Sequence, residues 1–351
     1  MTEPAASTWQ SDLARALADG GVEAAAWVPD KRLAPVADAL AARSVPVRTL
    51  TREEECIGWA AGYRAAGGTP LVLMQCSGLG NSLNAIGSLV VPYGLGFPLI
   101  LSMRGVLGER NPAQMGLGRS AVPMLELLGI QAFPAAPARG CGDAGTGRTG
   151  GGRRRPPARP DRARARAGHG PMNPTEAVAA LLRAHPDALF VASLGTATSA
   201  LRRAGDDGPH LYMGGSMGSA LAVAMGVAEK RPARRVVAVL GDGESVMGAG
   251  SLWSLAGVRP ANLLAAVLVD GHYTITGGQP LGVPALFADV ARALGLAAGV
   301  AESEADAERL ARELARPGLL EIRYGDRAWP GPSPFVDAPV VRARFEAAAA
   351  P

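Results

Sequence analysis

Cysteine, lysine and aromatic residues are scarce in this chain of 351 residues, which has three cysteines, two lysines and 5% aromatic residues. Three scattered cysteines are too few for a disulfide scaffold or a cysteine-based zinc site, so we expect a reducing compartment. Residues 1–10 lack the basic and apolar regions of a signal peptide. Residues 86–101, the longest apolar stretch, contain proline and glycine and fall short of the roughly 20 residues of a membrane span. We therefore expect a cytoplasmic protein without a membrane partner.

Positive charge is plentiful as arginine, but it is concentrated in one segment. Residues 134–171 contain nine arginines and two acidic residues, so this segment carries +7 and leaves −3 for the rest of a chain whose net charge is +4. A basic balance can indicate a nucleic-acid partner. No aromatic residue lies between Arg139 and Arg166 to stack on bases, so we expect no nucleic-acid partner. Nucleic-acid binding through this segment remains an alternative.

Helix-like and strand-like segments alternate over residues 10–130, where the last helix is expected at 122–128, and again over 172–330, where the first helix is expected at 173–183. This alternation predicts parallel βαβ units and an α/β protein of two domains, 1–133 and 172–351, each a parallel sheet flanked by helices. The segment 134–171, rich in arginine, glycine and proline, has too little apolar surface to offset its ordering entropy, which predicts a linker or atypical segment. It is either a natural insertion or a stretch rewritten by compensating frameshifts, and resequencing the gene would decide between them.

Acidic residues directly follow two of the expected strands. Gly-Asp-Gly at 241–243 follows the strand 236–240, and Asp-Gly-His at 270–272 follows the strand 263–269. Both acids therefore lie at the carboxyl edge of a parallel sheet, where α/β proteins bind ligands. The glycines allow close approach of an anion, toward which a helix expected to begin near Ser245 directs its positive end. Two carboxylates and a carbonyl suit Mg²⁺, and ordinary loop aspartates are the alternative.

The spacing of these acids resembles the motif of thiamine-diphosphate-dependent enzymes, in which an Asn follows Gly-Asp-Gly after some 25 to 30 residues. Here Asp270 follows Asp242 by 28 residues and stands where the family has Asn. The resemblance implies thiamine diphosphate and Mg²⁺ as cofactors. It also implies that Asp242, Asp270 and the backbone carbonyl of His272 are the metal ligands. The added negative charge of Asp270 would either tighten metal binding or repel diphosphate.

A glycine-rich turn at 215–218 precedes an expected helix over 219–229. Its Met217 lies 25 residues before Asp242, where similar enzymes have a bulky apolar residue that holds thiamine in a bent conformation. A flexible, polarizable methionine suits that role, and a core methionine beside a turn is the alternative. The resemblance implies these cofactor-binding residues: Gly215, Ser216, Met217, Gly241, Asp242, Gly243, Glu244, Ser245, Asp270, His272 and Tyr273.

Residues 51–63 resemble the helix that carries the catalytic glutamate of this superfamily. In that pattern the glutamate precedes the glycine of a closing Ala-Gly by nine residues, and counting back from Gly62 gives Glu53. Such a carboxylate, hydrogen-bonded to the aminopyrimidine ring, promotes the imino tautomer that removes the C2 proton of the thiazolium. The alternative is an acidic cluster that favours the helix macrodipole, which Glu54 and Glu55 fit.

Two further stretches, 75–81 and 273–279, resemble the Ser-Gly-Leu-Gly-Asn and Thr-Gly-Gly-Gln signatures of phosphonopyruvate and sulfopyruvate decarboxylases. The resemblance implies non-oxidative decarboxylation of a 2-oxo acid, most directly of 3-phosphonopyruvate to phosphonoacetaldehyde and CO₂. Arginine is a natural partner for a tetrahedral anion. The implied substrate residues, each with a structural role as its alternative, are Asp30, Ser77, Asn81 and Arg104.

Some features depart from the family or leave alternatives open. No histidine occurs in 109–115, where the family has a stretch that ends in one. Similar enzymes build the site between two chains, which implies a homodimer or homotetramer. A sulfopyruvate decarboxylase, or another 2-oxo acid decarboxylase or ligase of the same fold, is one alternative. An inactive thiamine-diphosphate-binding regulatory subunit is another, suggested by Asp270 and by segment 134–171.

Overall fold

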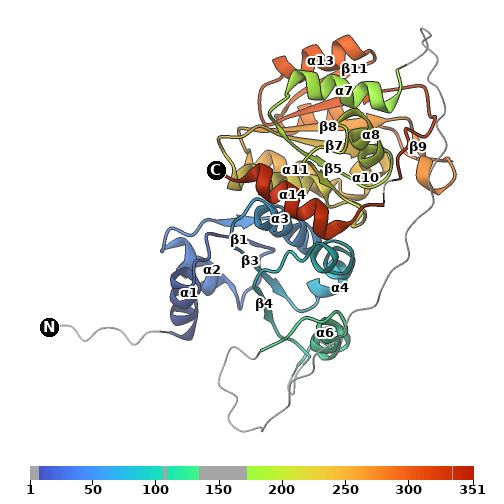
Figure 1. Cartoon of the computed structure of the whole chain (residues 1–351). Coiled ribbons are helices and arrows are strands. Elements are labelled where there is room, and N and C mark those ends of the chain that lie inside the picture. The colour runs from blue at the N-terminus through green and yellow to red at the C-terminus, as the bar shows by residue number, and fades with distance from the viewer. Residues whose placement is uncertain (1–7, 106–108, 134–171, 334) are drawn as a thin grey trace.

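The computed structural model describes residues 8–105, 109–133, 172–333 and 335–351, which form two α/β domains (Figure 1). The N-terminal domain has a parallel sheet of strand order β2-β1-β3-β4, and the C-terminal domain has a parallel sheet of order β11-β12-β8-β7-β5-β6. This confirms the predicted fold class. The predicted linker at 134–171 lies outside the described residues.

Helices cover both faces of the N-terminal sheet. Its strands are β1 (Ala24–Trp27), β2 (Val47–Thr49), β3 (Pro70–Gln75) and β4 (Leu99–Ser102). Its helices are α1 (Trp9–Asp19), α2 (Ala34–Ala41), α3 (Glu53–Ala65), α4 (Gly78–Ala85), the π-helix η1 (Ile86–Val90), α5 (Val91–Tyr93), the short 3₁₀ turn η2 (Pro112–Gln114) and α6 (Met115–Leu127). Buried side chains of α1 and α2 pack on one face, and those of α3 and α4 pack on the other.

Helix α6 begins seven residues before the helix that the sequence predicts at 122–128, so that boundary was wrong. Gly116 and Gly118 lower the helical signal there, because glycine disfavours helix interiors. The turn before it is capped by Asn111, whose side chain accepts a hydrogen bond from the Ala113 amide (3.1 Å). The capped turn feeds directly into α6.

The C-terminal domain repeats the pattern with a larger sheet. Its strands are β5 (Leu189–Ala192), β6 (Leu211–Tyr212), β7 (Val236–Gly241), β8 (Leu263–Val269), β11 (Ala297–Ala301) and β12 (Gly318–Arg323), with a short hairpin of β9 (His272–Tyr273) and β10 (Gln279–Pro280). Its helices are α7 (Pro174–Ala184), α8 (Thr196–Ala204), α9 (Ala220–Lys230), α10 (Asp242–Met247), α11 (Gly250–Val258), the 3₁₀ turn η3 (Thr274–Thr276), α12 (Phe287–Ala293), α13 (Glu304–Glu313) and α14 (Ala338–Ala349). Strands β7 and β8 are central, so their carboxyl ends lie in the middle of the sheet edge.

Helix α7 starts the second domain with a capping box. The Asn173 side chain accepts from the Glu176 amide (2.9 Å), and the Glu176 carboxylate accepts from the Asn173 amide (3.0 Å). Pro174 occupies the first turn, where its missing N–H costs nothing. The predicted helix at this position is therefore confirmed, with a start determined by local residues.

The two domains pack through α3 and α9, where backbone meets backbone. A Cβ added at Gly62 would lie 1.9 Å from the carbonyl oxygen of Val223, and one at Gly226 would lie 2.0 Å from that of Trp59. The indole of Trp59 also donates to Glu229 (2.8 Å). Helix α14, dark red in Figure 1, lies along the same boundary, and buried apolar side chains of both domains form one continuous core.

Across the described ranges, no helix is long and apolar enough to span a bilayer.

Candidate active site

A cleft opens at the carboxyl edge of the six-stranded sheet, beside the ends of β7 and β8. Its lining residues all come from the C-terminal domain: Leu194, Gly195, Thr196, Ala197, Met217, Gly241, Asp242, Gly243, Glu244, Leu268, Asp270, His272, Tyr273, Thr274, Ile275 and Tyr324. The topology explains this position, because parallel strands deliver their following loops to one edge. The structure therefore brings most of the predicted cofactor-binding residues together.

Asp242 joins the two strand ends. Its side chain is 4% exposed; Oδ1 accepts from the Gly243 amide (2.7 Å), and Oδ2 accepts from the amides of Asp270 (3.1 Å) and Gly271 (2.7 Å). Burial raises the pKa of Asp242 and the nearby Asp270 adds to the rise, while the amide hydrogen bonds oppose it. The carboxylate is thus fixed in place beside a second negative group.

Asp270 is held by its own loop. Its carboxylate accepts from the His272 amide (2.9 Å) and from the Thr274 hydroxyl (2.8 Å). Burial, with Asp270 as a further cause, raises the pKa of the neighbouring Tyr324 phenol. Thr274 and Tyr324 were not among the sequence-predicted site residues, because no spacing rule pointed to either.

The carboxylate pair fits a divalent cation. Among the described residues, no lysine or arginine forms an ion pair with Asp242 or Asp270. Burial is the main cause of the raised pKa of Asp242, and a bound Mg²⁺ would offset both the burial of the charge and the smaller repulsion from Asp270. No group of three or more His, Cys, Asp and Glu side chains suited to a metal occurs in the described part of the chain, so carbonyl or ligand oxygens would complete the shell.

The imidazole ring of His272 forms a hydrogen bond of its own, separate from the backbone carbonyl that was predicted to bind the metal. Its Nδ1 donates to the carbonyl oxygen of Asp270 (2.8 Å), which also accepts from Arg327 (2.9 Å). The loop closes where the Leu281 amide donates to the carbonyl of Gly271 (2.7 Å). The imidazole thus orients the loop, and metal binding by the His272 carbonyl remains a prediction.

Met217 and Tyr273 converge on Gly243. A Cβ at Gly243 would lie 2.5 Å from a ring carbon of Tyr273 and 3.4 Å from the Met217 Cε. A larger residue at 243 would therefore displace Tyr273. The Met217 loop contains Ser216 with a φ of 58° and Gly218 with a φ of 91°. Left-handed backbone at a serine persists only where surrounding contacts hold it.

The residues just after Gly-Asp-Gly face the protein interior. Helix α10 begins at Asp242, so the predicted start near Ser245 was wrong; Gly241 precedes it in extended backbone. The Ser245 hydroxyl donates to the Gly241 carbonyl (2.8 Å). The Glu244 carboxylate accepts from the amides of Gly218 (2.7 Å) and Ala220 (2.9 Å), and burial raises its pKa to about 7.

Glu53 lies elsewhere in the chain. It opens α3, and its side chain packs on Gly78, where a Cβ would lie 2.3 Å from the Glu53 Cγ. No residue of the N-terminal domain lines the cleft beside Asp242. One chain therefore does not bring Glu53 to this cleft. Glu55, in contrast, is buried against the C-terminal domain and accepts from the Ser254 hydroxyl (2.8 Å).

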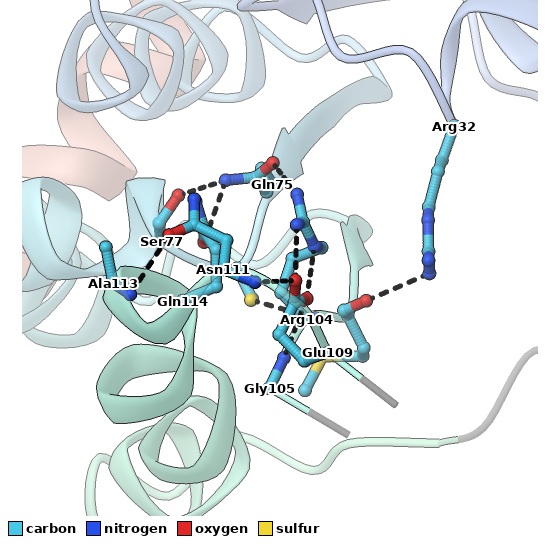
Figure 2. A network of polar contacts seen from close by, with 11 residues as sticks. Arg32, Gln75, Ser77, Arg104, Gly105, Glu109, Asn111, Ala113 and Gln114 are labelled. Atoms are coloured by element: carbon cyan, nitrogen blue, oxygen red, sulfur yellow. Dashed lines mark hydrogen bonds and ion pairs between the residues drawn. The ribbon is translucent and has the colours of Figure 1, made fainter. Parts of the chain in front are cut away.

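Two of the predicted substrate residues, Ser77 and Arg104, belong to a polar network at the carboxyl edge of the N-terminal sheet (Figure 2). Arg104 binds Glu109 through two nitrogens (2.7 and 2.8 Å) and donates to Gln75 (3.3 Å). Gln75 donates in turn to Ser77 (2.5 Å) and Gln114 (3.2 Å). Hydrogen bonding to Arg104 lowers the pKa of Glu109 to about 2. Arg104 is thus already neutralised.

Two of the four predicted substrate residues lie outside this network. Asp30, after β1, accepts from the amides of Arg32 (2.9 Å) and Leu33 (3.1 Å) and so shapes its own turn. Asn81 is exposed on α4. Glu109 was missed as a partner of Arg104, although 109–115 stood out in the sequence as a departure from the family.

Comparison with known proteins assigns the family. Residues 8–103 match the N-terminal TPP binding domain of thiamine pyrophosphate enzymes, and residues 194–321 match their C-terminal TPP binding domain. The chain belongs to the thiamine pyrophosphate enzymes. Thiamine pyrophosphate is the same molecule as thiamine diphosphate, so the predicted family is confirmed.

Comparison with individual proteins assigns the chain to a narrower family within the thiamine pyrophosphate enzymes. A phosphonopyruvate decarboxylase of Streptomyces hygroscopicus is 33% identical over 77% of this chain and 74% of its own. A sulfopyruvate decarboxylase of Methanosarcina acetivorans is 28% identical over 74% and 75%. A thiamine diphosphate-dependent 4-hydroxybenzoylformate decarboxylase of Rhodococcus jostii shares the fold, with a TM-score of 0.63 at 14% identity over 92% of this chain and all of that one. The chain is a member of the phosphonopyruvate and sulfopyruvate decarboxylase family.

Proposed function

We propose that this protein catalyses the thiamine-diphosphate- and Mg²⁺-dependent decarboxylation of 3-phosphonopyruvate to phosphonoacetaldehyde and CO₂. The observation that carries the proposal is the pair of carboxylates formed by buried Asp242 and half-buried Asp270, in a cleft that also contains Gly243 and Met217. The family match and the names of two similar decarboxylases support it. When bound, thiamine diphosphate supplies the electron sink that decarboxylation of a 2-oxo acid needs.

The residues of the cleft divide the work of holding the cofactor. Asp242 and Asp270 would hold Mg²⁺, and the backbone at Gly243 would hold the diphosphate. Met217 would pack against the organic part of the cofactor, a role that suits a flexible thioether. Tyr273, which contacts Gly243, closes the other side.

A second copy of the chain completes the site. Glu53 lies outside the cleft of its own chain, so we propose a homodimer or homotetramer in which the partner contributes this carboxylate to the aminopyrimidine. There the Glu53 carboxylate would hydrogen-bond the aminopyrimidine ring and favour its protonation, which is the acid–base role that this residue would supply. Activity should then depend on protein concentration around the dissociation constant of the dimer.

The N-terminal sheet edge receives the substrate's terminal anion. Arg104 retains a third nitrogen, Nη1, whose hydrogen bond to Gln75 is long (3.3 Å) and exchangeable for a substrate oxygen. Ser77 supplies a hydroxyl within the same network. Because phosphonate and sulfonate are both tetrahedral oxyanions, sulfopyruvate is the alternative substrate.

Reconstitution with thiamine diphosphate and Mg²⁺, followed by a 2-oxo acid panel, tests the proposal. We expect aldehyde formation from phosphonopyruvate with a higher kcat/KM than from sulfopyruvate or pyruvate. A preference for sulfopyruvate would reassign the substrate within the family. Cofactor binding without exchange of the C2 proton would instead indicate an inactive regulatory subunit.

A further inference from the structure

The loop that carries Met217 is held in place by a side chain from another part of the domain. We propose that Glu244 is a positioning residue that fixes Met217 beside Gly243, and so controls binding of the thiamine part of the cofactor separately from its diphosphate. The inference rests on the proposed function, and it assigns Glu244 a role other than contact with the cofactor.

The contacts of Glu244 are specific to this loop. Its side chain is 6% exposed, and each carboxylate oxygen accepts from one backbone amide: Oε2 from Gly218 (2.7 Å) and Oε1 from Ala220 (2.9 Å). Gly218 directly follows Met217, and Ala220 opens α9. These amides have no intrahelical partner, so Glu244 acts as a distant cap for the start of α9. Hydrogen bonds to a carboxylate are stronger than those between neutral groups.

The loop needs such restraint because of its backbone. Ser216 has a φ of 58°, a value that favours glycine, and its hydroxyl lies 2.6 Å from that of Ser219. On the far side, a Cβ at Gly248 would lie 2.2 Å from the Gly218 carbonyl oxygen, so α10 ends tightly against the loop. A left-handed serine relaxes when its surroundings loosen. Loss of the Glu244 bonds would therefore let Met217 move.

Glu244 also couples two parts of the cleft. It lies two residues after Asp242 on α10, so one short helix carries the predicted metal ligand on one side and holds the Met217 loop on the other. No described lysine or arginine forms an ion pair with Glu244, so the two amides at the start of α9 are the groups that stabilise its ionised form.

The decisive variant is Glu244→Gln. Glutamine keeps the volume but offers one acceptor oxygen and turns an NH₂ group toward one of the two amides. We expect the Kd of thiamine diphosphate, measured by isothermal titration calorimetry at saturating Mg²⁺, to rise about tenfold, as for one lost charge-assisted hydrogen bond. The Kd of inorganic diphosphate should stay within about twofold, because the metal and the backbone at Gly243 hold that ligand.

Glu321→Gln is the control for loss of a buried carboxylate outside the cleft. Glu321 is 1% exposed and accepts from the Ala288 amide (3.1 Å), and unlike Glu244 it also forms an ion pair with Arg323 (2.8 Å). It lies in β12 and does not line the cleft. We expect this variant to lower the melting temperature without changing the Kd of thiamine diphosphate. This control thus distinguishes the loss of stability that any buried glutamine would cause from an effect on the position of the Met217 loop.

A double-mutant cycle with Met217→Ala tests the route of the effect. If Glu244 acts through Met217, Glu244→Gln should weaken thiamine diphosphate binding far less in the Met217→Ala background. An undiminished tenfold effect there, or equal weakening of both ligands in the single variant, would overturn the inference. Unchanged thiamine diphosphate affinity in Glu244→Gln would overturn it too. A wild-type protein that does not bind thiamine diphosphate would overturn the proposed function itself.

Discussion

The carboxyl edges of the two sheets differ in the balance of charge among their side chains. At the C-terminal edge, Asp242 and Asp270 lie close together, no described lysine or arginine forms an ion pair with either carboxylate, and burial raises the pKa of Asp242. At the N-terminal edge, Arg104 is matched by Glu109 through two hydrogen bonds, which lower the pKa of Glu109. The first edge has a charge imbalance that a cation relieves, whereas the second is already neutral. A parallel sheet thus offers a location, and the loop residues decide what binds there.

The largest expected effect comes from forcing apart the two domains, which pack through α3 and α9. Gly62→Ala would place a Cβ 1.9 Å from the Val223 carbonyl oxygen, which forces α3 away from α9. We expect a loss of about 3 kcal/mol or more in the free energy of unfolding, measured by urea denaturation. Gly257→Ala is the control: this α11 glycine has no neighbour within 4 Å of an added Cβ, so we expect a gain of up to about 1 kcal/mol. Similar losses in both variants would contradict the close packing of α3 on α9.

Removing one carboxylate should remove the excess of negative charge at the C-terminal sheet edge. Asp242→Asn lacks a charge for Mg²⁺, so we expect kcat/KM to fall at least about 100-fold, with a much weaker Mg²⁺ dependence in EDTA-treated protein back-titrated with metal. Asp289→Asn changes an exposed acid on α12 and should leave both values unchanged. A fully active Asp242→Asn variant would rule out this metal site.

We expect acid to lower the free energy of unfolding, because protonation of His210 favours the unfolded chain. Burial lowers its pKa to about 4, so the unfolded chain binds a proton more readily than the folded one. The contribution of neutral His210 to stability is therefore fully present above the ordinary histidine pKa near 6.5, and about 3 kcal/mol of it is lost as the pH drops to about 4. Chemical denaturation at several pH values should show this slope in the wild type and a flatter one in His210→Phe. Equal slopes would exclude His210 as the cause.

The smallest effect concerns the neutral N-terminal edge. Glu109→Gln removes the charge that compensates Arg104, so we expect the KM for phosphonopyruvate to fall about threefold. Steady-state kinetics with pyruvate, which lacks the terminal anion, provides the control and should change little. An equal change for both substrates would show that Glu109 acts on the loop rather than on charge.

Local patterns predicted the strands that build the cleft. The apolar runs at 236–240 and 263–269 are buried strands with one residue of difference or none, because each is followed by a Gly-Asp or Asp-Gly turn. The helix start at Asp242 was misplaced by three residues, since nothing in the sequence shows that its carboxylate would accept the Gly243 amide. Helix α14 was not predicted at all, although an Asp-Ala-Pro start is readable there in retrospect.

Contacts between distant segments were beyond the sequence. The pairing of Arg104 with Glu109 is a contact between side chains that no pattern in the sequence encodes, and the position of Glu53 depends on how two domains pack. Spacing brought Met217 and Asp242 into one hypothesis, and the structure places Met217 beside Gly243. The spacing of residues in the sequence did not show that Glu244 holds the Met217 loop. That role arises from hydrogen bonds to backbone amides, which any residue type can supply.

The capping box at Asn173 has a consequence for how this gene can change. Asn173, Pro174 and Glu176 start α7 through contacts among themselves, and Met172 just before them is buried and accepts from the Gly325 amide (3.2 Å). The start of the helix is therefore encoded in a few neighbouring residues. Substitutions at Asn173 or Glu176 would move the point at which α7 begins, whereas changes far from them in the sequence would not.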